Sequence, residues 1–157
     1  LEEKISYNDQ FGAVKERLNR IQKVIRKEKS NYEQQENTLL IKQLVADQEA
    51  MADQEGTCII KRVDNVSIAN LRHIADQLTS QKNKLIVVLA ASVDDKGVVL
   101  VKSNIEQEDF AANTLVAKIT EKYGGGGGGR PTMAQAGGIA IQDLDQVMAF
   151  SRKLLTP

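Results

Sequence analysis

The first third of the chain places apolar side chains at alternating steps of three and four residues. This register runs from Phe11 to Leu39, with polar Glu28 and Gln35 filling two turns, and no proline occurs before Asp53. Such steps form the narrow seam of a coiled coil rather than the wider apolar face of a helix in a globule. The pattern predicts one long helix that pairs with another helix. The seam residues predicted to mediate dimerisation are Val14, Leu18, Ile21, Ile25, Tyr32 and Leu39.

Beyond Leu39 the apolar set broadens, which predicts that the helix there packs against another body of the protein. Gly56 has the position of a C-terminal helix cap, so the helix is expected to end there. We therefore expect residues 1–56 to form a helical dimerisation segment and residues 57–157 to form a globular domain.

The charge along this helix is segregated into two blocks. Residues 14–29 hold seven basic and two acidic side chains, whereas residues 31–55 hold one basic and six acidic side chains. When two copies of such a helix run antiparallel, the basic half of each lies beside the acidic half of the other. Either a helical hairpin turning at Ser30-Asn31 or an antiparallel homodimer of continuous helices satisfies this, and the unbroken heptad phase favours the homodimer. The basic half would equally suit an RNA backbone.

The rest of the chain alternates strand and helix patterns. The β-branched run 57–63 predicts a strand, Ser67 an N-cap for a helix ending near Gln81, and the run 85–91 a strand buried on both faces. Asp94 to Gly97 predicts a hairpin turn to a strand at 98–101. A helix at 108–122, a short strand at 134–141 and a last helix capped by Asp143 complete the pattern.

These elements predict an α+β chain in which a long coiled-coil helix precedes a small mixed-sheet α/β sandwich domain. The hairpin excludes a wholly parallel sheet. Aromatic residues make up only 4% of the 157 residues, and tryptophan is absent, so the core must be aliphatic.

Composition narrows the function classes. Basic and acidic residues number 21 each, so bulk charge gives no argument for nucleic acid. Cys58 is the only cysteine, which excludes an internal disulfide framework and fits a reducing, cytoplasmic location. We expect neither secretion nor membrane insertion, since the given sequence shows no charged-then-apolar stretch and no apolar run long enough for a membrane span. The chain begins with Leu1 in mid-pattern, and we expect it to be a fragment of a longer protein.

The segment 124–138, which reads GGGGGGRPTMAQAGG, is the most distinctive stretch of the sequence. Successive backbone N–H groups without side chains can line an anion site, with the Arg130 guanidinium as a phosphate partner. The run is no P-loop, since no Lys-Ser/Thr follows it. Alternatively, its glycines allow two backbones to approach closely. Overall we expect an ordered surface loop with a mainly conformational role.

Outside the segment 124–138, no combination of residues indicates a catalytic site. His73 is the single histidine, Cys58 lies in an apolar strand pattern, and no His, Cys and carboxylate cluster has metal-ligand spacing. We expect no catalytic residue and no metal site in this chain.

The segment 124–138 closely resembles the GGxGGGRPxMAQAGG signature near the end of alanyl-tRNA synthetases. The resemblance extends upstream through LIVVLAASVDDKGVVLV and downstream to Leu155, so that it covers residues 57–157, and the long helix resembles that family's coiled-coil connection. It implies a C-terminal DHHA1-type domain, shared with certain DHH phosphoesterases. The sequence departs from the signature at Gly126, where the family often has lysine, and at Thr132, where it often has aspartate.

The resemblance implies a non-catalytic module that binds the elbow of alanine-specific tRNA, contributes to dimerisation and couples aminoacylation with editing. It implies no cofactor here, since ATP and zinc belong to upstream domains. Two alternatives stay open: a structural oligomerisation module without RNA affinity, and the nucleotide-binding domain of a DHH-type phosphoesterase. The candidate RNA-binding residues are Arg130, Gly127, Gly128, Gly129, Lys61, Arg62, Arg72, Lys82, Lys84, Lys118 and Lys122.

Overall fold

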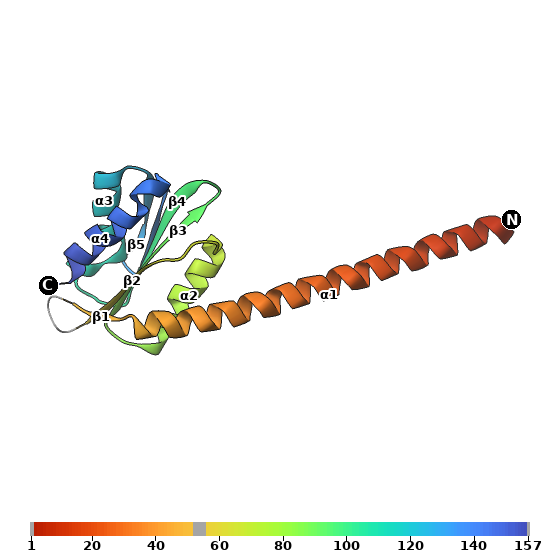
Figure 1. Cartoon of the computed structure of the whole chain (residues 1–157), viewed down its shortest axis with the longest axis horizontal. Coiled ribbons are helices and arrows are strands. Elements are labelled where there is room, and N and C mark those ends of the chain that lie inside the picture. Colours follow the sequence, from red (N-terminus) through yellow and green to blue (C-terminus); the bar gives the residue numbers. More distant parts are fainter. Residues whose placement is uncertain (1, 52–55, 157) are drawn as a thin grey trace. The chain divides into compact units, whose positions relative to one another are not determined.

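The computed structural model describes residues 2–51 and 56–156, and the side chains from Tyr7 onward in the first range. The chain divides into two compact units, Leu1–Leu39 and Leu40–Pro157. The predicted domain boundary at residue 56 concerns dimerisation and RNA binding, not compactness, and it stays a prediction. Figure 1 follows the elements along the chain.

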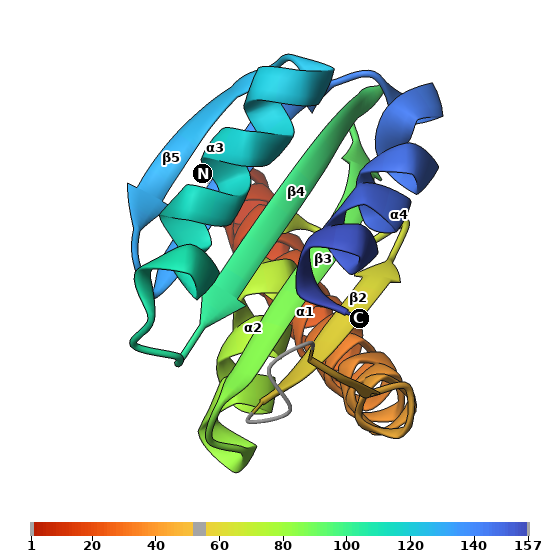
Figure 2. The ribbon, with the colours of Figure 1, turned by 90° about the vertical axis from the view of Figure 1, so that its left-hand side faces the viewer.

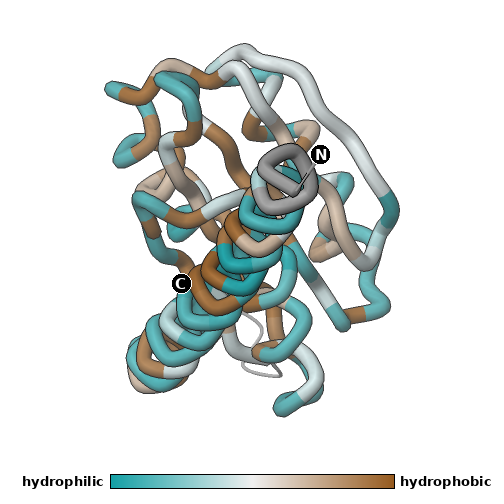
Figure 3. The backbone as a smooth tube through the Cα atoms, turned by 90° about the vertical axis from the view of Figure 1, so that its right-hand side faces the viewer, coloured by the Kyte–Doolittle hydropathy of each residue, from teal (hydrophilic) through white to brown (hydrophobic). Residues whose placement is uncertain are grey.

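The first unit is helical throughout its described length. Helix α1 spans Glu2–Ala46 without interruption, which confirms the continuous helix over the hairpin at Ser30-Asn31. Figure 3 shows apolar residues recurring among hydrophilic ones along it. The predicted helix end was wrong: α1 stops at Ala46, Glu49–Ala50 form the short strand β1, and Gly56 instead accepts a hydrogen bond from the Met51 N–H at 3.0 Å.

The second unit is built on a six-stranded sheet in the order β1-β2-β3-β4-β6-β5. The strands β2, β3 and β4 span Thr57–Arg62, Leu85–Val93 and Lys96–Ser103, and β5 and β6 span Gly126–Arg130 and Met133–Ile139. Strands β2 and β3 are parallel, because α2 connects them across one face, and the other neighbours are antiparallel. The sheet is therefore mixed, as predicted.

Helices cover both faces of this sheet. Helix α2 (Ile68–Gln81) begins as predicted, with the Ser67 hydroxyl accepting a hydrogen bond from the Asn70 N–H at 3.2 Å. It lies on one face, while α3 (Ala112–Tyr123) and α4 (Leu144–Leu155) lie on the other, as Figure 2 shows. Asp143 occupies the predicted N-cap position of α4, but its side chain makes no capping hydrogen bond, so the predicted side-chain cap was wrong.

Helix α3 also starts later than predicted. A short 3-10 turn, Glu108–Phe110, replaces its expected first turn, because Ala111 adopts an extended conformation with ψ of 141° between the two elements. Phe110 still packs against the core on the α3 side.

Two apolar layers hold the sandwich together. One lies between the sheet and α3 and α4, and includes Val88, Val101 and Leu115. The other lies on the α2 face, and there Ile41 and Leu44 from the end of α1 join Leu71 and Ile74 of α2. This confirms the prediction that the seam gives way to packing beyond Leu39. The layers are almost wholly aliphatic, as the composition requires, and burial of such side chains is the main stabilising term.

Candidate nucleic-acid interface

The glycine run is a β-strand at the edge of the sheet, not the surface loop expected. Gly126–Arg130 forms β5 and pairs antiparallel with β6, while α3 covers one face of the two strands. A loop was predicted because glycine has a low strand propensity. Here the pairing of β5 with β6 outweighs that propensity. All five residues of β5 are exposed.

Alternate glycines of this strand serve different purposes. A Cβ on Gly127 would lie 2.2 Å from the Gln135 carbonyl oxygen, and one on Gly129 would lie 2.5 Å from the Met133 carbonyl oxygen. Gly126 and Gly128, in contrast, would accept a Cβ with no atom within 4 Å. Within β5 the conformational role predicted for the run belongs to Gly127 and Gly129, and Gly125 shares it, with a φ of +84° and the Gly137 carbonyl oxygen 2.5 Å from an added Cβ.

Arg130 ends β5 opposite Met133, and Gln135 lies opposite Gly128 on the same face of the sheet. Arg72 of α2 reaches that face, where its Nε and Nη2 donate to the Gln135 Oε1 at 3.2 and 2.6 Å. Arg130 is therefore two strand positions from the pair of Gln135 and Gly128, and Gln135 in turn holds the Arg72 guanidinium on this face. We call Arg72, Gly126, Gly128, Arg130 and Gln135 the arginine face.

Lys102 lies beside the arginine face, since it is opposite Met133 on β4, but it is ion-paired with Asp76 of α2. Neither Gln135 nor Lys102 was among the predicted site residues. The alternation of Met133, Ala134, Gln135 and Ala136 carried the signal for Gln135, because period two places it on the face opposite the buried alanines.

Several predicted RNA-binding cations are engaged with partners in the protein. Lys61 is paired with Asp47 at 2.9 Å, and Arg62 with Asp64 at 3.0 Å and Asp145 at 3.2 Å. Hydrogen bonds to these two carboxylates raise the pKa of Arg62. Such compensation lowers the positive potential that these side chains offer to a phosphate.

The remaining predicted cations are spread over the second unit. Lys82 donates to the Gln48 side chain, and Lys84 has a partner of its own and lines a cavity of about 350 Å³ with Asn104. Lys118 and Lys122 lie on α3, with Lys122 Nζ 4.3 Å from the Phe150 ring centroid. The structure thus places Arg130, Gly128 and the Gln135-bound Arg72 on one face of the sheet, and the α3 lysines on the opposite side.

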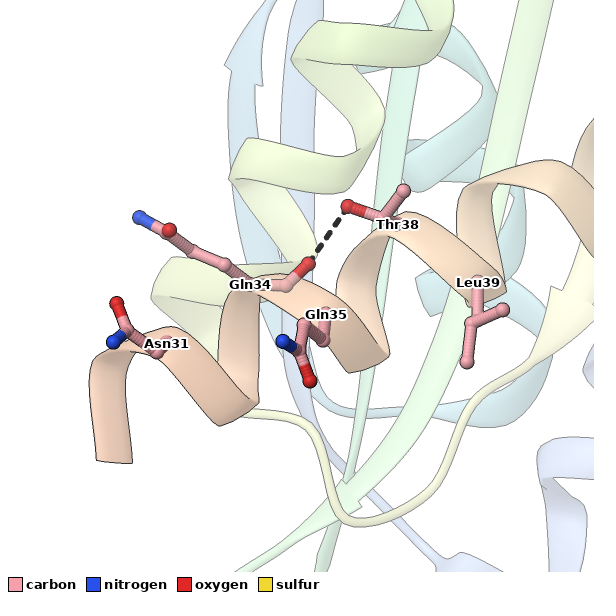
Figure 4. Close-up of a pocket in the computed structure, with 5 residues that line it drawn as sticks. All are labelled: Asn31, Gln34, Gln35, Thr38 and Leu39. Atoms are coloured by element: carbon pink, nitrogen blue, oxygen red, sulfur yellow. Dashed lines mark hydrogen bonds between the residues drawn. The ribbon is translucent and has the colours of Figure 1, made fainter. Parts of the chain in front are cut away.

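The apolar seam of α1 is solvent-exposed in the single chain. The apolar side chains from Phe11 to Leu39 in this register are 54–65% exposed, and the polar Glu28 and Gln35 are exposed as well. Figure 4 shows Gln35 and Leu39 extending from the same side of the helix in a hollow lined also by Asn31, Gln34 and Thr38. The Thr38 hydroxyl turns away and donates to the Gln34 carbonyl at 2.8 Å.

The acidic block expected to complement the basic one is smaller on the helix than the sequence suggested. Asp47 and Glu49 lie beyond α1 and are paired with Lys61 and Arg152, each at 2.9 Å, while Asp53 and Glu55 fall outside the described residues. Only Glu33 and Glu36 remain on the helix after residue 31. The charge argument for an antiparallel pair rests on these two residues.

Neither Cys58 nor His73 forms a reactive group with its neighbours. Cys58 is buried in β2, where burial raises the pKa of its thiol to about 11. His73 is exposed on α2, with its Nε2 3.1 Å from the Gln77 side-chain nitrogen. Among the described residues, no three His, Cys, Asp or Glu side chains gather as metal ligands would. No described helix combines the length and apolar content needed to cross a membrane.

The second unit is an α/β/α sandwich with a glycine edge strand and an arginine-bearing face. Residues 55–156 match the DHHA1 domain, and the chain belongs to the DHHA1 family. The similarity continues to the alanine–tRNA ligases: the Bacillus cytotoxicus enzyme is 36% identical over 105 residues, which are 65% of this chain and 12% of that protein. The Bacillus thuringiensis enzyme is 37% identical over 91 residues, 57% of this chain and 10% of its own.

A solved structure agrees with these relatives. The C-Ala domain of the Aquifex aeolicus alanyl-tRNA synthetase has a TM-score of 0.61 and 25% identity, covering 70% of this chain and 98% of that domain. The resemblance to the C-terminal domain of alanyl-tRNA synthetases is thereby confirmed. The chain spans about a tenth of the length of the curated relatives it matches.

Proposed function

We propose that this chain acts as a non-catalytic C-terminal part of an alanine–tRNA ligase. It binds the elbow of alanine-specific tRNA, supports dimerisation, and helps to couple aminoacylation with editing in the parent enzyme. The observation that carries the proposal is the similarity to the C-Ala domain over 98% of that domain's length. The proposal places the protein in the cytoplasm and assigns ATP and zinc to other domains of the parent.

The arginine face supports RNA binding by the second unit. Arg130 is exposed, and Arg72 is held over the same sheet face by a neutral glutamine, so both keep their charge available to a phosphate. Gly126 and Gly128 leave the strand open, so a sugar–phosphate backbone can approach closely. Among the predicted cations of this unit, Arg130 and Arg72 are the ones we assign to tRNA.

Filter binding with alanine-specific tRNA tests this assignment. Affinity should exceed that for heparin at equal charge and fall steeply with salt. Arg130→Ala should weaken binding, whereas Lys153→Ala, an exposed cation on α4, should not. Equal affinity for tRNA and heparin would contradict specific recognition.

The exposed seam of α1 supports dimerisation. A row of apolar side chains more than half exposed is costly in water and is stabilised by a partner helix. Sedimentation equilibrium at micromolar concentration should give a dimer without RNA. A monomer would remove this part of the proposal.

The exposed seam also favours the second candidate, a structural oligomerisation module whose parent binds RNA elsewhere. Compensation of Lys61 and Arg62 by carboxylates is in line with it. A dimer in sedimentation without measurable tRNA affinity would decide for this candidate.

A further inference from the structure

The seven basic residues of α1 between positions 15 and 29 form a charged region that the seam does not use. Every described side chain from Tyr7 to Tyr32 is exposed. One ion pair occurs within this region, Arg20 to Glu16 at 3.8 Å, with both side chains more than 70% exposed. Exposed pairs of this length contribute little, so the region keeps its positive potential.

Three of these cations lie on the side of the helix opposite the seam. At 100° per residue, Arg20, Lys23 and Lys27 follow one another at spacings of three and four, and the seam residues Leu18, Ile21 and Ile25 lie on the other side. The three span about 10 Å along the axis at 1.5 Å per residue. We call Arg20, Lys23 and Lys27 the basic stripe.

We propose that the basic stripe is a second tRNA contact, which binds the phosphate backbone while the seam is occupied by a partner helix. The inference rests on the proposed function, since it takes tRNA as the ligand of the chain. A row of exposed cations on a rigid helix, opposed only by the weak Arg20–Glu16 pair, matches the linear charge of a nucleic-acid strand.

The position of the stripe argues against two other occupants. A basic helix lying on a membrane keeps its cations at the border of its apolar face, so that they reach the headgroups, whereas the stripe would point away from the bilayer. An acidic partner helix would dock along the seam, where the flanking positions, not the stripe, meet its charges. A nucleic-acid backbone needs no apolar contact, so it can bind the stripe on the polar side of the helix, away from the seam.

The test compares two triple variants of equal charge in the complete chain. Arg20→Gln, Lys23→Gln and Lys27→Gln remove the stripe, and Lys15→Gln, Lys29→Gln and Lys42→Gln remove three cations of α1 outside it. Glutamine has nearly the same helix propensity as lysine and arginine, so α1 should persist, and circular dichroism checks this. Affinity for alanine-specific tRNA is measured from 50 to 300 mM salt.

The stripe variant should reduce the slope of log K against log salt by about 2 to 3, as expected for three lost phosphate contacts, and the control by less than 1. Equal slopes for the two variants would overturn the inference. Loss of affinity in Arg130→Ala with an unchanged stripe variant would leave the proposed function intact and remove only the stripe. Wild-type binding no tighter than heparin binding would instead remove the proposed function.

Discussion

Arg72 on α2 donates two hydrogen bonds to a single oxygen, Oε1 of Gln135 on β6. The residues are 63 positions apart in sequence, and their contact fixes a guanidinium above the sheet face that also carries Arg130. A carboxylate at Gln135 would cancel this charge. The neutral amide orients Arg72 and leaves its positive charge unbalanced.

We expect Gln135→Ala to weaken tRNA binding severalfold, because Arg72 then keeps its charge but loses its orientation. Arg72→Gln should weaken binding further. If Gln135 acts through Arg72, its substitution should have no additional effect in the Arg72→Gln background, which filter binding of the double variant measures. Additive effects would show that Gln135 contacts RNA independently.

Neighbouring glycines of β5 should respond differently to alanine. At Gly127 a Cβ would lie 2.2 Å from a backbone oxygen and 2.6 Å from the Ala136 Cα, so β5 must shift away from β6. We expect Gly127→Ala to reduce the free energy of unfolding by about 2 kcal/mol or more.

Gly128→Ala is the matched control, since its Cβ meets nothing within 4 Å. It should change the free energy of unfolding by less than about 0.5 kcal/mol. Urea denaturation followed by circular dichroism compares the two, and equal destabilisation would refute the assignment of close backbone approach to Gly127.

A lysine at Gly126 should strengthen tRNA binding. The position is exposed, on the arginine face, and free of contacts within 4 Å of a Cβ, so Gly126→Lys adds a cation without strain. The salt slope should become steeper by about 1, as for one new phosphate contact. Ala149→Lys is the control, at an exposed position of α4 on the opposite face of the sheet, and it should leave the slope unchanged.

Local patterns predicted most of the fold. The β-branched run at 57–63, the Ser67 cap and the Asp94 turn each carry a short-range signal, and the structure has β2, α2 and the β3–β4 hairpin at those places. The end of α1 could not be predicted in this way. Asp47 and Glu49 suit a helix locally, but their pairing with Lys61 and Arg152 depends on β2 and α4, which lie far along the chain.

The site was predicted less completely than the fold. Arg130 and the glycines stand out in the sequence, but their partner Gln135 and the compensation of Arg62 by Asp145 arise from tertiary contacts. Basic residues on the globule were all equivalent candidates in the sequence. Only the packing of α2 against the sheet distinguishes Arg72 from Lys61 and Lys118.

Cys58 should be unreactive in the folded chain. Burial, and to a smaller extent the charge of Glu49, raises the pKa of its thiol to about 11, against 9.0 for a free thiol, while Arg152 opposes this. The unfolded thiol loses its proton near pH 9 and the folded one near pH 11, so this group's contribution to stability is complete below pH 9 and is lost as pH rises toward 11.

Two measurements check this. Iodoacetamide at pH 8 should modify Cys58 in urea but not in the native chain. Urea midpoints between pH 8 and 11 should fall more for the wild type than for Cys58→Val, which lacks the titrating group. Parallel pH dependence in the two proteins would contradict the shifted pKa.

Cysteines in the seam of α1 distinguish the two orientations of a helix pair. In a parallel dimer Val14 would face its own copy, so Val14→Cys alone would form a disulfide-linked dimer readily. We propose the antiparallel arrangement, in which Val14→Cys should crosslink poorly by itself and efficiently when mixed with Leu39→Cys. Non-reducing electrophoresis after equilibration in a glutathione buffer reports the result, with wild type as control because its only cysteine is buried. Efficient crosslinking of Val14→Cys alone would establish the parallel orientation and show that Glu33 and Glu36 do not direct the pairing.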